Sequence, residues 1–154
     1  MNILTKYLEN FDWEGIELHP YKDNDGNPSF KDVTRQTIFK EDKVNGLELR
    51  YFEIATSGHT SLEKHEHTHL VVPIRGSGSC FVDDTVTELR LHDCVYVSSW
   101  SWHQFRASEA EPLGFLCLVN VERDRPTLPT AHEVKELQKA PEIARFIRPR
   151  LINP

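Results

Sequence analysis

Residues 33–121 form a succession of short apolar runs, and this succession most limits the folds open to the chain. The runs are rich in β-branched and aromatic residues and are bounded by Gly, Asp, Asn and Ser, as strands are. They recur about every ten residues with short turns and no βαβ alternation. The pattern predicts an all-β antiparallel sandwich or barrel with strands at 33–39, 47–56, 61–66, 69–75, 79–82, 85–90, 94–98, 102–107 and 113–121.

The two ends of the chain have a different character. Residues 3–11 are predicted to form a short helix, and residues 23–28 (DNDGNP) to form a turn. Thr130 and Glu133 match a capping box, and Pro141 suits the first position of a second helix. The sequence therefore predicts a single domain over residues 1–154, with a barrel at about 33–121 and a helical tail at about 130–148.

The composition narrows the partners and the location. A formal net charge of −6 leaves no basic surface for nucleic acid or for an anionic membrane. The N-terminal residues (MNILTKYLENFDW) carry charges where a signal peptide would be apolar. No apolar run approaches the roughly 20 residues that span a bilayer. We therefore expect a cytoplasmic protein whose partner is a small molecule.

A cluster of histidines indicates a metal site. In the segment EKHEHTH (63–69), histidines recur at every second position, which is one face of a strand. Imidazole is the commonest ligand for transition metals. On one straight strand Glu63 and His69 would lie roughly 20 Å apart, too far for bonds of about 2 Å to one ion. The chain must therefore turn inside the cluster, and His103 would close the site from a distant strand.

Two registers satisfy this requirement. In the first, Glu63 and His65 end one strand, residues 66–68 turn, and His69 opens the next strand. In the second, His65 and His67 are the ligand pair, and Thr68 alone separates them from His69. One residue is too short for a comfortable reversal, so we favour the first register. His67 then faces solvent in the turn, whereas in the second register it replaces Glu63 as a ligand.

These residues resemble the first motif of the cupin superfamily, G-x5-H-x-H-x3–4-E-x6-G. In the first register, Glu63, His65, His69 and Gly76 have the spacing of that motif from its first histidine onward. Glu63 stands at the first histidine and His69 at the glutamate, so the set keeps one carboxylate and two imidazoles in permuted order. Four residues separate Gly58 from Glu63 and six separate it from His65, whereas the motif has five, so neither register matches this glycine.

The second cupin motif, G-x5-P-x-G-x2-H-x3-N, is matched in outline by residues 92–107. His103 stands at its metal-binding histidine. The usual Gly, Pro, Gly and Asn are replaced, in that order, by His92, Ser98, Trp100 and Ala107. His92 is expected at a turn, because His tolerates the left-handed region better than most residues.

The resemblance implies a function as well as a fold. A small single-domain cupin is an antiparallel β-barrel, a double-stranded β-helix or jelly roll, with one divalent metal ion inside. The implied ligands are Glu63, His65, His69 and His103, and Glu63 would also act as a catalytic base. Fe(II) is favoured, with Mn, Ni, Co, Cu or Zn as alternatives.

The implied reaction is an oxidation by O2, in the manner of a dioxygenase, of a small organic molecule. Two alternatives stay open: a non-oxidative, metal-dependent isomerase or lyase, and a small-ligand-binding cupin without turnover. The resemblance also implies a homodimer.

Two further sets of residues are candidates for lining such a site. The cysteines lie far apart, inside apolar runs, and are predicted to be reduced and buried: Cys80, Cys94 and Cys117. Of these, Cys80 and Cys94 are the candidates for lining a metal cavity. Four residues can bind a substrate carboxylate if they project inward, although each arginine by itself is expected to be solvent-facing or ion-paired: Arg50, Tyr51, Arg75 and Arg106.

Overall fold

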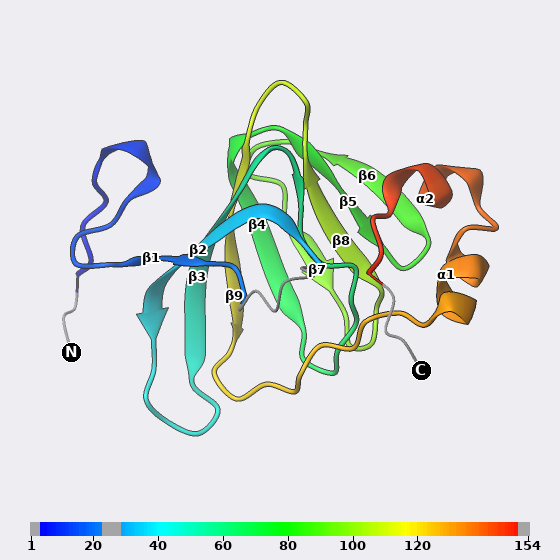
Figure 1. The fold of residues 1–154 in the computed structure, drawn as a ribbon. Helices are drawn as coiled ribbons and strands as arrows, with labels where there is room; N and C mark the ends of the chain where they lie inside the picture. The colour runs from blue at the N-terminus through cyan, green and yellow to red at the C-terminus, as the bar shows by residue number, and fades with distance from the viewer. Residues whose placement is uncertain (1–3, 23–28, 151–154) are drawn as a thin grey trace.

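The computed structural model describes residues 4–22 and 29–150, and their strands form one curled antiparallel sheet of nine strands (Figure 1). The predicted all-β class is confirmed. The strands are β1 (Leu18–Pro20), β2 (Lys31–Lys40), β3 (Leu47–His59), β4 (His69–Gly76), β5 (Gly78–Val82), β6 (Thr85–Leu89), β7 (Val95–Val97), β8 (His103–Ala107) and β9 (Leu113–Asn120).

Strand β3 is the centre of the sheet and accounts for its curl. In the described part of the chain, hydrogen bonds link the strands in the order β6-β5-β8-β3-β9-β4-β7, with β2 on β3 and β1 on β2. Most of β3 pairs with β9, but its last residue, His59, pairs with Arg106 of β8. Because one strand contacts different partners along its length, the sheet bends into a half-barrel around an apolar core. That core includes Phe52, Ile54, Val71, Phe105, Leu113 and Phe115.

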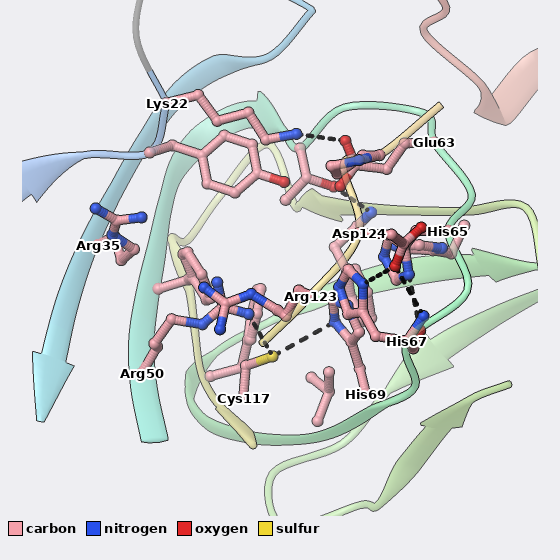
Figure 2. A pocket seen from close by; sticks show the side chains of 18 residues that line it. Lys22, Arg35, Arg50, Glu63, His65, His67, His69, Cys117, Arg123 and Asp124 are labelled. Carbon is pink, nitrogen blue, oxygen red and sulfur yellow. Dashed lines mark hydrogen bonds and ion pairs between the residues drawn. The ribbon is translucent and has the colours of Figure 1, made fainter. Parts of the chain in front are cut away.

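The sheet differs from the prediction in two places. Residues 61–66 do not form a regular strand; Glu63 and Lys64 make only isolated bridges, to His103 and Thr127. The sheet also begins before residue 33, because β1 adds to the edge of β2. Tyr21 and Lys22 follow β1 and line a cavity, in which Figure 2 shows Lys22.

The predicted N-terminal helix is wrong for the described residues 4–11. That stretch contains only a 3-10 turn, Glu9–Phe11. Asn10 and Phe11 have φ angles of 63° and 60°, which lie in the left-handed region and stop a right-handed helix. The predicted turn at 23–28 lies outside the described residues.

Three positions of the two motifs have the left-handed backbone that normally calls for glycine. Gly76 has a φ of 65°, and a Cβ there would lie 1.7 Å from the carbonyl oxygen of Pro112, so glycine is required. His92 and Trp100 keep φ angles of 71° and 63° without being glycine. The turn expected at His92 is confirmed. The loops thus retain the backbone of the motif where the residue type has changed.

The C-terminal tail is helical, as predicted, and packs against β6 at one end of the sheet (Figure 1). Helix α1 (Ala131–Leu137) begins at the predicted capping box of Thr130 and Glu133, and α2 (Pro141–Phe146) begins at its proline. A second apolar cluster joins the tail to the sheet through Leu62, Phe81, Val134, Ile143, Phe146 and Ile147. No helix among the described residues is long and apolar enough to cross a membrane.

Candidate functional site

The segment that carries the histidines turns where the first register places the turn. Glu66 and His67 lie in a bend, and His69 is the first residue of β4. Glu63 pairs with His103 in both directions: the Glu63 N–H donates to the His103 carbonyl at 3.2 Å, and the His103 N–H donates back at 3.0 Å. This bridge joins the histidine cluster to β8 and places His103 beside it.

Three imidazoles converge as a result. The nitrogen atoms of His65, His69 and His103 that are available for binding lie within 4.8 Å of one another. The rings of His65 and His69 are stacked, with centroids 4.5 Å apart, and His103 stands edge-on to both. Three ligand atoms at such separations can share one metal ion.

Hydrogen bonds orient these rings for ligation. The Nδ1 atom of His65 lies 2.8 Å from the His67 carbonyl, and the Nδ1 atom of His103 lies 2.9 Å from the Ser101 carbonyl. A carbonyl can only accept, so both Nδ1 atoms carry the proton and both Nε2 atoms have a free lone pair. The Nε2 atoms of His65 and His69 are buried without a hydrogen-bond partner among the described residues. Two buried ring nitrogens without a hydrogen-bond partner fit a metal ion.

The protonation state of the cluster also suits a metal. Burial lowers the pKa of His65 and His69, and it lowers the pKa of His103 to about 4. All three rings are therefore neutral at neutral pH, which is the form that binds metal.

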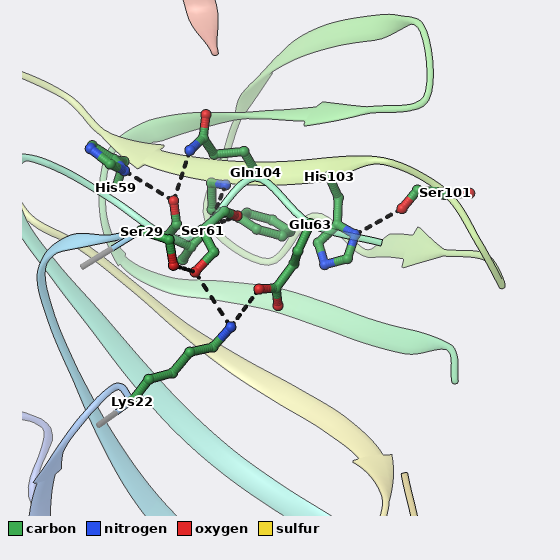
Figure 3. Close-up of polar contacts among 10 residues, drawn as sticks. Lys22, Ser29, His59, Ser61, Glu63, Ser101, His103 and Gln104 are labelled. Carbon is green, nitrogen blue, oxygen red and sulfur yellow. Dashed lines mark hydrogen bonds and ion pairs between the residues drawn. The ribbon is translucent and has the colours of Figure 1, made fainter. Parts of the chain in front are cut away.

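Glu63 has a different partner from the one expected of a metal ligand. Its buried carboxylate forms an ion pair with Lys22, beside His103 (Figure 3). Burial is the strongest single influence and opposes ionisation of Glu63. The charge and hydrogen bond of Lys22, together with the nearby His103 and His65, outweigh it and hold the pKa of Glu63 below its usual value. Among the described residues, Glu63 is not part of the group whose ligand atoms converge. Ligation by Glu63 therefore stays a prediction.

His67 lines the cavity rather than facing solvent. Its ring stacks on the ring of His65, with the centroids 3.6 Å apart, and its Nδ1 lies 2.6 Å from an Asp124 carboxylate oxygen. The same carboxylate accepts the backbone N–H groups of Glu66 and His67 at 2.8 and 3.1 Å. Although desolvation opposes ionisation, these bonds hold the pKa of Asp124 well below its usual range. Asp124 thus fixes the turn between His65 and His69. His65, His67 and Asp124 also form a second group close enough for a metal.

The histidines lie in one wall of a cavity of about 190 Å³ (Figure 2). Its apolar wall consists of Phe52, Val71, Phe105, Phe115 and Pro126. Its basic residues are Lys22, Arg35, Arg50 and Arg123. A small, partly apolar pocket with a few polar groups is typical of a small-molecule site.

The candidate residues from the sequence divide into those inside and those outside this cavity. Of the arginines, Arg50 lines it, whereas Arg75 pairs with Glu53 and Arg106 donates to the Phe146 carbonyl. The hydroxyl of Tyr51 also bonds to Glu53 rather than lining the cavity.

The cysteine predictions need correction. Cys80 is buried in the core, but Cys94 is exposed, and the thiol that lines the cavity is that of Cys117. Its Sγ lies 3.5 Å from the His69 Nδ1 and 3.6 Å from an Arg50 nitrogen. Cys94 is exposed because it lies in the turn before β7, which starts only at Val95.

Several cavity residues were missed from the sequence. Arg35 lies two residues after the buried Val33 on β2 and so shares its face, and this period of two was the signal that could have placed Arg35 inside the sheet. Lys22 and Asp124 lie before and after the predicted barrel. No local pattern marks them, because they reach the cavity through long-range packing.

Comparison with known proteins agrees with this geometry. The family model described as "Cupin domain" matches residues 50–119. A crystal structure of a cupin 2 conserved barrel domain protein from Rhodopseudomonas palustris has a TM-score of 0.87 and 43% identity, over 94% of this chain and 99% of that one. A cupin-2 domain structure from Rhodospirillum rubrum has a TM-score of 0.81 and 41% identity, over 91% of this chain and 93% of that one.

A characterised relative extends the match. The 1-methylthio-D-xylulose 5-phosphate methylsulfurylase of Rhodospirillum rubrum is 42% identical over 141 residues, which is 92% of this chain and 89% of that protein. This chain is a cupin. Its similarity to a named enzyme over nearly its whole length suggests catalytic activity, and the converging histidines form a candidate three-histidine metal site.

Proposed function

We propose that this cupin binds a divalent metal ion and transfers the methylthio group of a methylthio-substituted pentulose phosphate. The observation that carries the proposal is the 42% identity to a methylsulfurylase over 92% of the chain. Relatives that share this much sequence over a whole domain usually share the type of reaction. The three-histidine cluster supplies an independent, chemical reason, because the named substrate is a ketose and offers a carbonyl and a neighbouring hydroxyl to one ion.

The proposed reaction balances as a group transfer. The bond between C1 and sulfur breaks, and its electron pair stays on C1, which takes up a proton. The methylthio sulfur forms a new bond to the sulfur of a thiol acceptor, and the acceptor thiol supplies the proton. A divalent ion held by His65, His69 and His103 supplies Lewis-acid polarisation of the adjacent carbonyl.

The residues around the cluster suit the handling of that proton. Glu63 lies against His103 and is ionised, so its carboxylate can take a proton and release it. Burial and the charge of Glu63 raise the pKa of Tyr21 to about 12, so its hydroxyl stays protonated and can donate a hydrogen bond. The aromatic wall would limit the access of water to the reacting carbon.

An anaerobic assay tests this function. Metal-loaded protein is incubated without O2 with 1-methylthio-D-xylulose 5-phosphate and a small thiol, and the products are followed by mass spectrometry. We expect a 1-deoxyketose phosphate and a methyl disulfide, and loss of both in His103→Ala. Absence of these products with any of Fe, Mn, Ni, Co, Cu or Zn would refute the proposal.

Oxidation by O2 is the second candidate. The cluster of imidazoles suits Fe(II), which is the ion favoured by the sequence resemblance. A dioxygenase would consume O2 and would give no product in the anaerobic assay, so the same experiment separates the two. The homodimer stays a prediction, and the mass in solution tests it.

A further inference from the structure

We propose that Arg35 and Arg50 bind the phosphate group of the substrate, at the side of the cavity away from the histidines. This inference rests on the proposed function, because that function supplies a phosphate monoester. It adds the residues that recognise this group and the direction in which the substrate lies.

The register of β2 and β3 places both guanidinium groups in the cavity. Arg35 pairs with Phe52, and Thr37 pairs with Arg50, so the two arginines are diagonal neighbours on one face of the sheet. Both line the cavity together with Phe52. Figure 2 shows them on the opposite side of the cavity from His65, His67 and His69.

Each arginine has a buried donor without a partner. The Nε atoms of Arg35 and Arg50 are both buried and make no hydrogen bond among the described residues. Arg50 is only 8% exposed, and its guanidinium is held over the ring of Phe52. A buried donor left unsatisfied is unfavourable, and a charged one more so. Two such donors facing the same cavity therefore indicate a missing acceptor.

The carboxylates around the cavity are already engaged elsewhere. Glu63 pairs with Lys22, and Asp124 with His67. One Glu48 oxygen accepts from Arg123 at 2.8 Å, while the other forms a longer ion pair with Nε of Arg50 at 3.8 Å, without a hydrogen bond. Arg35 has no carboxylate within that distance in the described part of the chain. In a protein with a net charge of −6, this is a local excess of positive charge that an anionic ligand would neutralise.

The chemistry of the site favours a phosphate over a carboxylate. One guanidinium can satisfy a carboxylate with two parallel hydrogen bonds. Two guanidinium groups, one from each strand, match the three peripheral oxygens and the double charge of a phosphate monoester.

The position relative to the metal site sets the direction of the substrate. Cys117 Sγ contacts both Arg50 and His69, so this side chain connects the arginine end of the cavity to the histidine end. A pentulose phosphate carries its carbonyl near one end and its phosphate at the other. With the phosphate on Arg35 and Arg50, the carbonyl end and its methylthio group point toward His65, His69 and His103.

Titration calorimetry of the metal-loaded protein with unreactive probes tests the inference. D-xylulose 5-phosphate lacks the methylthio group, so it cannot be turned over. We expect Arg35→Met and Arg50→Lys to weaken its binding by about 10- to 100-fold, the loss expected for charge-assisted hydrogen bonds. D-xylulose should bind at least about tenfold more weakly than its phosphate, and Arg35→Met should not affect it. The exposed Arg90, as Arg90→Met, is the matched control and should leave both affinities unchanged.

The inference would be overturned by equal affinity for D-xylulose and its phosphate, by unchanged binding in both arginine variants, or by binding of acetate as tight as that of inorganic phosphate. Loss of phosphate binding in His103→Ala with retention in Arg35→Met would do so as well, because the phosphate would then be on the metal. If the buried Arg50 variant does not fold, Arg35→Met still tests the inference. Thermal melting shows whether each variant is folded. The binding assay involves no turnover, so its result is independent of the anaerobic methylthio-transfer assay. Failure of the phosphate-site inference can therefore be told apart from failure of the proposed function.

Discussion

Lys22 and Glu63, 41 positions apart in the sequence, form an ion pair in the wall of the cavity (Figure 3). The Glu63 side chain is almost completely buried, and that of Lys22 is 33% exposed. A buried carboxylate needs a compensating charge, and Lys22 of the N-terminal segment provides it. This pair connects a part of the chain outside the predicted barrel to the residue bridged with His103.

Replacing Lys22 should therefore destabilise the fold. Removing one partner of a buried pair costs about 3–5 kcal/mol, and the partial exposure of Lys22 reduces the expected loss to about 2 kcal/mol for Lys22→Met. The double variant Lys22→Met/Glu63→Gln should regain most of it, because no buried charge is then left alone. Urea denaturation at pH 7 measures both. Lys43→Met, which breaks an exposed pair with Glu41, is the control and should give no measurable loss.

Metal content should depend on each converging histidine. We expect His65→Ala, His69→Ala and His103→Ala to lower the bound metal at least about tenfold, because each removes one of three ligand nitrogens. Elemental analysis of the untagged protein measures this, with the exposed His132→Ala as the control. The variant Glu63→Gln tests ligation by Glu63, because an unchanged metal content would show that its carboxylate is not a ligand. Full metal content in the three histidine variants would place the ion elsewhere.

Asp124 should support the metal site without touching the ion. Its carboxylate holds the backbone of Glu66 and His67 and the ring of His67, and so fixes the turn between two ligands. We expect Asp124→Ala to weaken metal binding by about 10- to 100-fold, measured by competition with a chelator. Asp42→Ala removes an exposed carboxylate and should have no effect. Unchanged affinity in Asp124→Ala would show that the turn keeps its shape without this anchor.

The anchor of the helical tail should be sensitive to acid. Lys64 and the backbone N–H of Thr130 bond to Glu133 and lower its pKa to about 2, from an ordinary value of 4.5. A depressed pKa contributes stability that is present above pH 4.5 and is lost as the pH falls toward 2. Because both side chains of the pair are partly exposed, we expect Glu133→Gln to lower the free energy of unfolding by only about 1 kcal/mol at pH 7.

Denaturation of Glu133→Gln at pH 7 and at pH 3 measures this effect. The difference in free energy of unfolding between the variant and the unmodified protein should shrink at the lower pH, where Glu133 begins to take up a proton. The exposed Glu122→Gln should show no such difference at either pH. A difference that grows on acidification would contradict the assigned role of Lys64.

Local sequence patterns were sufficient for most strands of the sheet, for the turn within the histidine segment and for the helical tail. Alternation of side chains marks strands, and the limited reach of metal bonds required the turn between His65 and His69. The capping box at Thr130 is likewise a local signal, since its hydrogen bonds join residues three apart. These features depend on neighbours in the chain, and so the amino-acid order alone determined them.

Only the tertiary structure decided what surrounds the histidines. Two ion pairs join distant segments, one between Lys22 and Glu63 and one between Asp124 and His67. The pairing of β2 with β3 likewise brings Arg35 and Arg50 into one cavity. Whether a given charge is buried, paired or left for a ligand depends on which partners the folded sheet brings within a few ångströms. No local periodicity carries that information, because the Coulomb energy depends on distance in space rather than along the chain.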